Sequence, residues 1–420
     1  MKIKNCYFLL LLFCFYFSNS SAQKKNIIQI TGKVYIDNEP IENAAVYLNS
    51  TMVGTTTDAN GEFKLPVDEG EYQLIVSFLG YKNITYNLKT STYKNPLIFS
   101  LELETKSLDE IIITSKNGKK SKLSRNKRNR YFAKFRETFI GTTKFSKKCK
   151  ILNPEVLKFN YNKTTKELTV NATEPLKIRN ESLGYLITYN LEYFMLSPTQ
   201  IAYMGFSKYT EMKSKKEKEI KQWSQNRLRS YLGSKQHFFK SLINKDYRRE
   251  KYKIALVQKI KNPERATNEE IKKANNYITQ QKMKNVFVDF TKEIDYPSNK
   301  LDSAIIAVNS SKLPLFTYKI INKYIKQKEF FNKINNDYFL SFQHELRVKF
   351  MAEEEEKNYP RNGPKLKHQE SYIRLLTNQV KVNANGTLEK PFNVFVTGYW
   401  SFEQFADDLP TDYIPNFDKN

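Results

Sequence analysis

The sequence has few cysteines and few histidines, and their scarcity excludes several kinds of catalytic site. Its 420 residues include three of each. The histidines, His237, His344 and His368, do not stand at the spacings that zinc peptidases or zinc deaminases use for their ligands. The Gly-x-Ser-x-Gly turn of serine hydrolases and the phosphate-binding P-loop are also missing. We therefore expect no catalytic residues, no metal site and no cofactor.

Long apolar runs are missing too, except near the start of the chain. Two lysines precede eleven consecutive, largely apolar residues at 7–17, and the small residues Ser20 and Ala22 follow. A helix of that length rises only about 16 Å, whereas the hydrocarbon core of a membrane is about 30 Å thick. The pattern predicts a secretory signal peptide over residues 1–22. We expect no transmembrane segment in the mature chain.

Cleavage of that peptide removes two of the three cysteines and leaves Cys149 alone. No intramolecular disulfide can then form. A lone cysteine in an oxidising compartment can be a nucleophile or can link two chains. We favour a third role, that of a small buried side chain.

The charge balance is strongly basic. Lysine and arginine outnumber aspartate and glutamate by 69 to 44, which gives a formal net charge of +25. Such an excess attracts anionic partners but also occurs in generally basic proteomes, so charge alone does not choose between the two. Because export separates the chain from nucleic acid, we expect no nucleic-acid partner. An envelope protein or an anionic envelope surface is the candidate partner.

Short strands dominate residues 23–105. Apolar and polar residues alternate within 28–36, 72–76 and 99–103, and turn residues separate these runs at a short, regular spacing. The pattern predicts an all-β sandwich of six or seven strands. Asp58 begins a segment similar to an EF-hand calcium loop, but its glycine stands at position 4 instead of 6, so a β-turn is the better interpretation.

Four short motifs follow one another in this region. They are Thr31-Gly32-Lys33-Val34, Pro40-Ile41-Glu42-Asn43-Ala44-Ala45-Val46, Gly54-Thr55-Thr56-Thr57-Asp58-Ala59-Asn60-Gly61-Glu62-Phe63 and Val76-Ser77-Phe78-Leu79-Gly80-Tyr81. Together they resemble the carboxypeptidase-regulatory-like domain, a transthyretin-like sandwich of exported proteins in Gram-negative bacteria, often found ahead of outer-membrane receptors. Asn43 stands where that family usually has glycine, and asparagine tolerates positive φ. The resemblance implies an accessory domain in the periplasm or at the outer membrane, without peptidase chemistry.

Residues 106–130 are expected to connect this sandwich to the rest of the chain. A short apolar strand at 108–114 resembles the one that closes the same domain in TonB-dependent receptors. It is followed by eight cations and no acid: Lys116, Lys119, Lys120, Lys122, Arg125, Lys127, Arg128 and Arg130. Because like charges repel, we predict a flexible linker. The same cations are our candidates for contact with an anionic envelope surface.

Residues 131–420 mix helical and strand patterns and predict a larger α+β, β-rich domain. Aromatic residues four apart indicate a short helix at 131–139, and one long helix is expected at about 219–244. The lysine-rich stretch 259–284 is interpreted as a helical insertion or a loop. The expected strands include 156–161, 167–171, 183–194, 200–206, 252–257, 286–290, 316–321, 338–350, 372–382 and 392–402.

Parts of this region, including Pro175-Leu176-Lys177-Ile178 and Gly398-Tyr399-Trp400, resemble an uncharacterised domain that follows the same sandwich in many exported proteins. Trp223, Arg227 and His237 lie at helical spacing and are candidates for an aromatic and basic binding face. We prefer the interpretation that places Trp223 in the core and Arg227 in a surface ion pair. The acidic run at 353–356 is interpreted as solvated, because adjacent carboxylates repel one another.

These observations favour an exported, envelope-associated binding or scaffold protein without an identifiable catalytic activity. Two alternatives remain: an enzyme that acts on an envelope polymer through carboxylates brought together in space, and a peripheral scaffold attached through its basic linker. Spatially paired acids, one of them with a raised pKa, would favour the enzyme. Membrane association that weakens strongly with salt would favour the peripheral scaffold.

Overall fold

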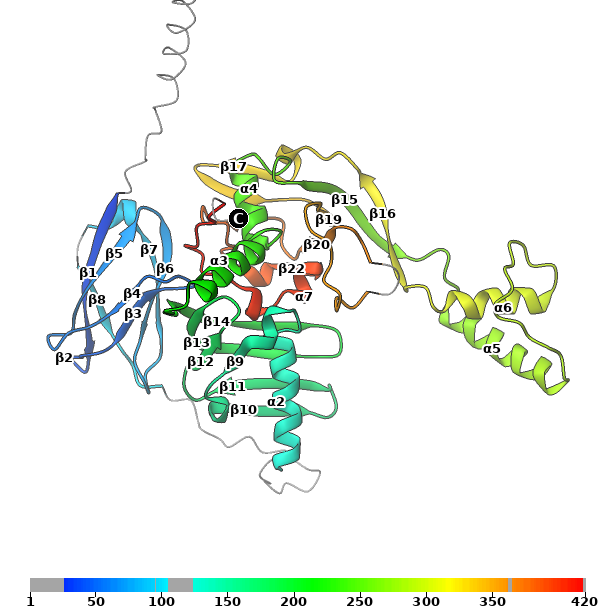
Figure 1. Cartoon of the computed structure of the whole chain (residues 1–420), viewed down its shortest axis with the longest axis horizontal. Helices are drawn as coiled ribbons and strands as arrows, with labels where there is room; N and C mark the ends of the chain where they lie inside the picture. Colours follow the sequence, from blue (N-terminus) through cyan, green and yellow to red (C-terminus); the bar gives the residue numbers. More distant parts are fainter. Residues whose placement is uncertain (1–25, 95, 105–123, 362–364, 418–420) are drawn as a thin grey trace, which may run out of the picture.

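The computed structural model describes residues 26–94, 96–104, 124–361 and 365–417 (Figure 1). Several predicted features lie outside these residues: the signal peptide, the strand at 108–114 and the cations Lys116, Lys119, Lys120 and Lys122. Within the described ranges, no helix combines the length and the apolar character that crossing a membrane requires.

The N-terminal part is a sandwich of two four-stranded sheets, as predicted. One sheet has the order β2-β1-β5 with β8 beside β1, and the other has the order β4-β3-β6-β7. Both sheets contribute to one core, for example through Phe63 and Leu74. The strands are β1 (Ile27–Ile36), β2 (Glu39–Pro40), β3 (Ala45–Leu48), β4 (Gly54–Thr56), β5 (Glu62–Asp68), β6 (Glu71–Ser77), β7 (Ile84–Lys89) and β8 (Leu97–Ser100), with the 3-10 turn η1 (Thr90–Thr92) before β8. The number exceeds our prediction because β2 and β4 are too short to show a period.

Three residues of the sandwich motifs have backbone roles. Asn43 stands where the family usually has glycine, and its φ of +64° is the positive value that this replacement predicts. Oδ1 of Asp58 accepts two backbone N–H bonds within its own turn, both 2.9 Å long, and so forms the predicted β-turn. Gly32 lies where β1 pairs with β8, and a Cβ atom there would stand 2.4 Å from the carbonyl oxygen of Leu97. Only glycine permits this close approach.

The next part of the chain is a six-stranded sheet of order β10-β11-β13-β12-β9, with β14 paired to β13. Helix α2 packs on it: the rings of Phe135 and Phe194 lie 4.8 Å apart, and those of Phe139 and Tyr189 lie 5.1 Å apart. The elements are α2 (Arg125–Phe139), η2 (Phe145–Lys148), β9 (Cys149–Ile151), η3 (Pro154–Val156), β10 (Leu157–Asn162), β11 (Glu167–Ala172), β12 (Leu176–Asn180), β13 (Tyr185–Leu196) and β14 (Ile201–Glu211).

The prediction of a flexible linker is wrong for its last six residues, because α2 already begins at Arg125. The apolar half of the helix is buried, and this packing stabilises the preceding turns despite their like charges. Arg128 adds a contact, since its guanidinium donates to the carbonyl oxygen of Pro154 at 2.9 Å. The four cations of this segment therefore have fixed positions on a helix.

The remaining sheets have the orders β16-β15-β19-β20-β22 and β17-β18-β21. They share a second core that includes Phe238, Leu346 and Trp400. A hairpin of α5 and α6 projects away from the sheets (Figure 1). The elements are α3 (Glu217–Tyr231), α4 (Lys235–Ile243), β15 (Tyr252–Lys261), α5 (Asn268–Met283), α6 (Lys300–Ser310), β16 (Phe316–Asn322), η4 (Gln327–Glu329), β17 (Phe331–Ile334), β18 (Asp337–Leu340), β19 (Glu345–Phe350), β20 (Gln369–Leu375), β21 (Val380–Val382), η5 (Pro391–Asn393), β22 (Val394–Gly398), α7 (Tyr399–Phe402) and η6 (Phe405–Asp407). The α+β, β-rich prediction is confirmed, although this region has two large cores instead of one.

The single helix predicted at 219–244 is wrong, because the structure has two helices there. Gly233 interrupts the helix with a φ of +79°, and a Cβ atom at this position would stand 2.6 Å from Oε1 of Gln369. Ser234 then caps α4, since its side chain accepts the backbone N–H of His237 at 3.2 Å. An apolar stripe that continues through both helices conceals this break from periodicity alone.

Four strand predictions are also wrong. The expected strand at 372–382 is divided into β20 and β21, and the one at 392–402 ends at Gly398, where α7 begins. The expected strand at 338–350 is divided into β18 and β19, and His344 between them has a φ of +65°. Residues 286–290 form no strand but belong to the loop between α5 and α6, where Val288 and Phe290 pack on the two helices. Alternation shows which side chains are buried but not whether a neighbouring strand exists to pair with them.

Residues 399–413, which we call the C-terminal segment, cross both large cores. Trp400 belongs to the second core: its ring lies 5.3 Å from that of Phe238, and its Nε1–H donates to the carbonyl oxygen of Gly233 at 2.6 Å. Phe405 belongs to the first core and stacks on Phe139 with ring centroids 4.7 Å apart. One short segment therefore holds the two sheets together.

Candidate functional site

Two of the three predicted binding-face residues, Trp223 and Arg227, lie on α3 and contact the same turn. The Trp223 ring is 5% exposed, and its Nε1–H donates to the carbonyl oxygen of Glu181 at 2.9 Å. Nε of Arg227 donates to the carbonyl oxygen of Leu183 at 2.7 Å, and its guanidinium pairs with Glu211 at 2.5 Å. These contacts fix the turn and leave little of either side chain for a ligand.

The third residue, His237, is buried on α4 at 4% exposure. Its Nδ1 accepts the backbone N–H of Gly233 at 3.1 Å, so the ring hydrogen is on Nε2, which lies 3.2 Å from the carboxylate of Glu250. Burial lowers the pKa of His237, although Glu250 opposes this shift. The structure therefore does not unite His237 with Trp223 and Arg227 on an exposed face.

The four described linker cations occupy the first turns of α2. Arg125, Lys127 and Arg130 are exposed, whereas Arg128 is half-buried against the chain at Pro154. The guanidinium of Arg128 also lies 5.8 Å from the centre of the Phe159 ring. Three cations near one helix end are thus available to an anionic surface.

Four carboxylates gather where the C-terminal segment passes between the two sheets. We call this group the carboxylate seam; its members are Glu353, Glu356, Glu403 and Asp407. Oδ2 of Asp407 accepts the hydroxyl of Thr143 at 2.8 Å, and Oε2 of Glu356 accepts the backbone N–H of Lys144 at 3.0 Å. Glu353 accepts the side-chain amide of Gln369 at 3.2 Å. The seam therefore joins residues from three distant stretches of the chain.

The surroundings of three members of the seam, Glu353, Glu403 and Asp407, raise their pKa values. Burial raises the pKa of Glu403 well above its ordinary value, and the neighbouring charge of Asp407 raises it further. Burial also raises the pKa of Asp407, although the hydrogen bond from Thr143 opposes the shift. For Glu353, burial outweighs the opposing charge of Arg229. Carboxyl groups with raised pKa values can donate a proton near neutral pH, which is what a general acid does.

The sequence carried no signal for this seam. Glu403 and Asp407 lie far along the chain from Glu353, and no spacing rule connects them. The interpretation of 353–356 as a solvated run is wrong for Glu355, whose side chain is buried and pairs with Arg361. A buried acid can occur in such a run when a cation from a later turn compensates its charge.

Other chemistry-bearing groups are few in the part of the chain that the structure describes. There, no three His, Cys, Asp or Glu side chains are grouped so that they could hold a metal ion. Cys149 is fully buried on β9, as predicted, and burial raises the pKa of its thiol to about 12. A thiol with so high a pKa is a poor nucleophile at neutral pH.

The sandwich is docked on the six-stranded sheet through the turn between β3 and β4. The backbone N–H of Ser50 donates to the carbonyl oxygen of Ser207 at 2.7 Å, and that of Tyr209 donates to Thr51 at 2.9 Å. The C-terminal segment joins the same contact, because the N–H of Thr411 donates to the carbonyl oxygen of Ser50 at 2.7 Å. Main-chain bonds of this kind fix the orientation of the two parts.

Side-chain hydrogen bonds add to the docking contact. The buried amide of Asn190 on β13 donates to the hydroxyl of Tyr47 on β3 at 3.0 Å. The carboxylate of Asp412 accepts the backbone N–H of Met52 at 3.1 Å. Buried polar groups that satisfy one another across a contact specify one arrangement of its two sides.

Comparison with known proteins places the sandwich in a family. Residues 30–113 match the family model of the CarboxypepD_reg-like domain. The TonB-dependent receptor P39 of Formosa agariphila is 32% identical to this chain over 120 residues. That similarity covers 27% of this chain and 11% of the receptor, so the chain spans about a tenth of the length of that relative. The N-terminal sandwich is a CarboxypepD_reg-like domain.

Proposed function

We propose that the chain is an exported, envelope-associated protein with a binding or scaffolding role. The observation that carries this proposal is the docking contact: an accessory sandwich is fixed by main-chain bonds to a larger region instead of hanging from it. Such a unit presents its surfaces in one geometry, which suits a binding or scaffolding part. The partial similarity to a TonB-dependent receptor supports the same compartment.

Cell fractionation with intact-mass measurement tests the proposed location of the protein. We expect the protein in the envelope fraction, with the first 22 residues removed. A full-length chain in the cytoplasm would overturn the proposal, because the protein would then be in the wrong compartment to meet an envelope partner.

We further propose that the basic stretch at 116–130 contacts anionic envelope phosphates. Arg125, Lys127 and Arg130 support this, because they are exposed at one end of α2. Exchange of all eight cations for glutamine should weaken sedimentation with phosphatidylglycerol vesicles at low salt, and 1 M salt should weaken that of the parent. Equal binding of parent and variant at low salt would make the stretch a spacer only. Exchange of Lys272 and Lys273 on α5 for glutamine controls for general charge loss.

A second candidate function is hydrolysis of an envelope polymer by the carboxylate seam. The raised pKa values of Glu403 and Asp407 favour it, since general acid catalysis needs a protonated carboxyl group. Purified protein is incubated with isolated peptidoglycan, and release of soluble fragments is measured. Activity that Glu403→Gln and Asp407→Asn both abolish would support the enzyme. If both variants still release fragments, or if the parent releases none, the seam has a structural role and no catalytic one.

A further inference from the structure

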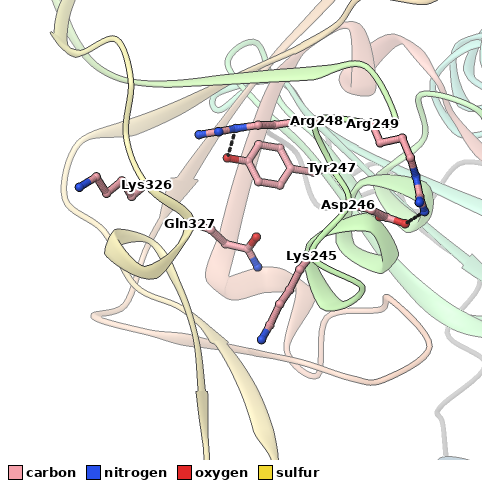
Figure 2. A pocket seen from close by; sticks show the side chains of 7 residues that line it. All are labelled: Lys245, Asp246, Tyr247, Arg248, Arg249, Lys326 and Gln327. Atoms are coloured by element: carbon pink, nitrogen blue, oxygen red, sulfur yellow. Dashed lines mark hydrogen bonds and ion pairs between the residues drawn. The ribbon is translucent and has the colours of Figure 1, made fainter.

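A hollow of about 510 Å³ opens beside the C-terminal end of α4 (Figure 2). Two segments line it: the turn between α4 and β15, and the start of η4. The lining residues are Lys245, Asp246, Tyr247, Arg248, Arg249, Lys326 and Gln327. Four of the seven are cations and one is an acid. We call this site the basic hollow.

The turn after α4 is rigid. Lys245 has a φ of +60°, and its N–H donates to the carbonyl oxygen of Leu242 at 3.1 Å. Further along, the N–H of Tyr252 donates to the carbonyl oxygen of Tyr247 at 2.9 Å. The side chain of Tyr247 is 7% exposed and belongs to the second core. The backbone that carries the cations is therefore fixed before any ligand arrives.

The second segment is tied to the first. The side-chain amide of Gln327 donates to the carbonyl oxygen of Leu242 at 2.7 Å. Ile325 and Phe330, on either side of Lys326, are buried in the same core as Tyr247. The two walls of the basic hollow therefore keep their separation.

The cations of the hollow differ in how their charge is compensated. Arg249 pairs with Asp246 at 2.9 Å, and Figure 2 shows its side chain directed toward that acid. Nε of Arg248 donates to the hydroxyl of Tyr247 at 3.1 Å, which orients the guanidinium and leaves its two terminal amino groups free of hydrogen bonds to described residues. Among the described residues, no carboxylate forms an ion pair with the side chain of Lys245, Arg248 or Lys326. The acid nearest to them in contact is Glu329, whose Oε2 accepts the backbone N–H of Lys326 at 2.7 Å. Three exposed cations thus line the hollow without an ion pair to a described carboxylate.

We propose that the basic hollow binds a phosphate group. A guanidinium presents parallel N–H donors that match two phosphate oxygens, and lysine ammonium groups supply mobile point charges around them. A multiply charged anion fits the excess of positive charge better than a monocarboxylate does. The phosphate belongs either to a soluble phosphorylated compound or to a lipid headgroup, and the experiment distinguishes these two sources. None of the lining residues belongs to the basic stretch at 116–130.

Isothermal titration calorimetry of the mature chain, residues 23–420, tests the proposal. Inorganic phosphate and glucose 1-phosphate are the soluble probes, and phosphatidylglycerol vesicles are the membrane probe. The double variant Lys245→Gln with Arg248→Gln should weaken binding at least about tenfold, because each lost charged hydrogen bond contributes that order of affinity. Arg249→Gln is the matched control, and its effect should be smaller since Asp246 already neutralises Arg249. Circular dichroism of each variant checks the fold.

The outcomes separate cleanly. Binding of the soluble probes that the double variant loses supports a soluble phosphorylated ligand, and loss confined to the vesicles supports a lipid headgroup. The proposal is overturned if none of the three probes binds at millimolar concentration, or if the folded double variant binds them as the parent does. It is also overturned if acetate competes as well as phosphate, because the site would then recognise charge and not the phosphate group.

Discussion

The sandwich and the larger region of this chain complete their cores in different ways. Every residue in the sandwich core comes from residues 28–101, so that core is local in sequence. The two large cores of the remaining region need the C-terminal segment: Phe405 lies in the core with Phe139, and Trp400 lies in the core with Phe238. A local core can form by itself, whereas the other two depend on residues more than 150 positions away along the chain.

The largest expected effect comes from removing the C-terminal segment. A chain that ends at Gly398 lacks the aromatic residues that close both large cores, so we expect their sheets to lose cooperative folding while the sandwich remains folded. Hydrogen exchange followed by mass spectrometry measures this, with slow exchange expected in β1 and β6 and fast exchange in β13 and β19. Phe417→Ala, which changes a ring that is 58% exposed, is the control and should leave exchange in both regions unchanged. Slow exchange in β13 and β19 of the shortened chain would contradict the comparison.

A single exchange in the same segment should have a smaller effect. Phe405→Ala removes a ring that is 3% exposed and stacks on Phe139, which should lower the free energy of unfolding of the larger region by about 3–5 kcal/mol. Urea denaturation measures the change. Phe417→Ala is the matched control, because that ring is 58% exposed. If both variants lose the same stability, Phe405 does not close the core.

The sequence predicted the sandwich better than the larger region, because the sandwich is specified by residues that are close together along the chain. In the sandwich, turn residues such as Asp58 and alternating strands are local signals, and the structure confirms them. For the larger region, sequence patterns predicted the α+β class and most of the strands. They did not predict the break between α3 and α4 at Gly233 or the end of the last strand at Gly398, because both depend on tertiary contacts. A Cβ on Gly398 would stand 2.5 Å from the carbonyl oxygen of Glu370, a partner that no periodicity identifies.

The candidate site was even less accessible to sequence reasoning. Patterns within a helix singled out Trp223 and His237 as candidates for a binding face. The preferred placement of Trp223 in the core is confirmed, and His237 is buried as well. The carboxylate seam and the basic hollow instead combine residues from separate stretches, such as Lys245 with Lys326. Spatial proximity of this kind leaves no spacing in the sequence. Charge runs identify cations, but only the fold determines which of them lack an acid.

A third test addresses the contact between the two parts. Tyr47→Phe removes the hydroxyl that accepts the amide of Asn190 and leaves that amide only two weaker partners at 3.5 Å. We expect the full chain to lose about 1–2 kcal/mol of stability, since a buried donor loses its best partner. The same exchange in an excised sandwich, residues 23–105, should cost less, because Asn190 is absent there. Equal losses in both proteins would mean that the hydroxyl serves the sandwich alone.

The smallest expected effect distinguishes the two parts by the sign of their pH dependence. Burial raises the folded-state pKa of Glu403, so the folded larger region holds a proton that the unfolded chain releases at lower pH. Its stability should therefore fall as pH rises from the ordinary carboxyl pKa toward the raised value. For Glu71 of the sandwich the sign is opposite: the hydrogen bond from Lys89 chiefly, and a second one from Lys381 of the larger region, lower its pKa, so its contribution to stability is lost as pH falls. Glu403→Gln should make the larger region more stable than the parent at pH 8 and leave it unchanged at pH 4, by urea denaturation. Glu269→Gln, on an exposed side chain of α5, is the control. A variant that is less stable than the parent at pH 8 would show that Glu403 is ionised and paired in the folded state.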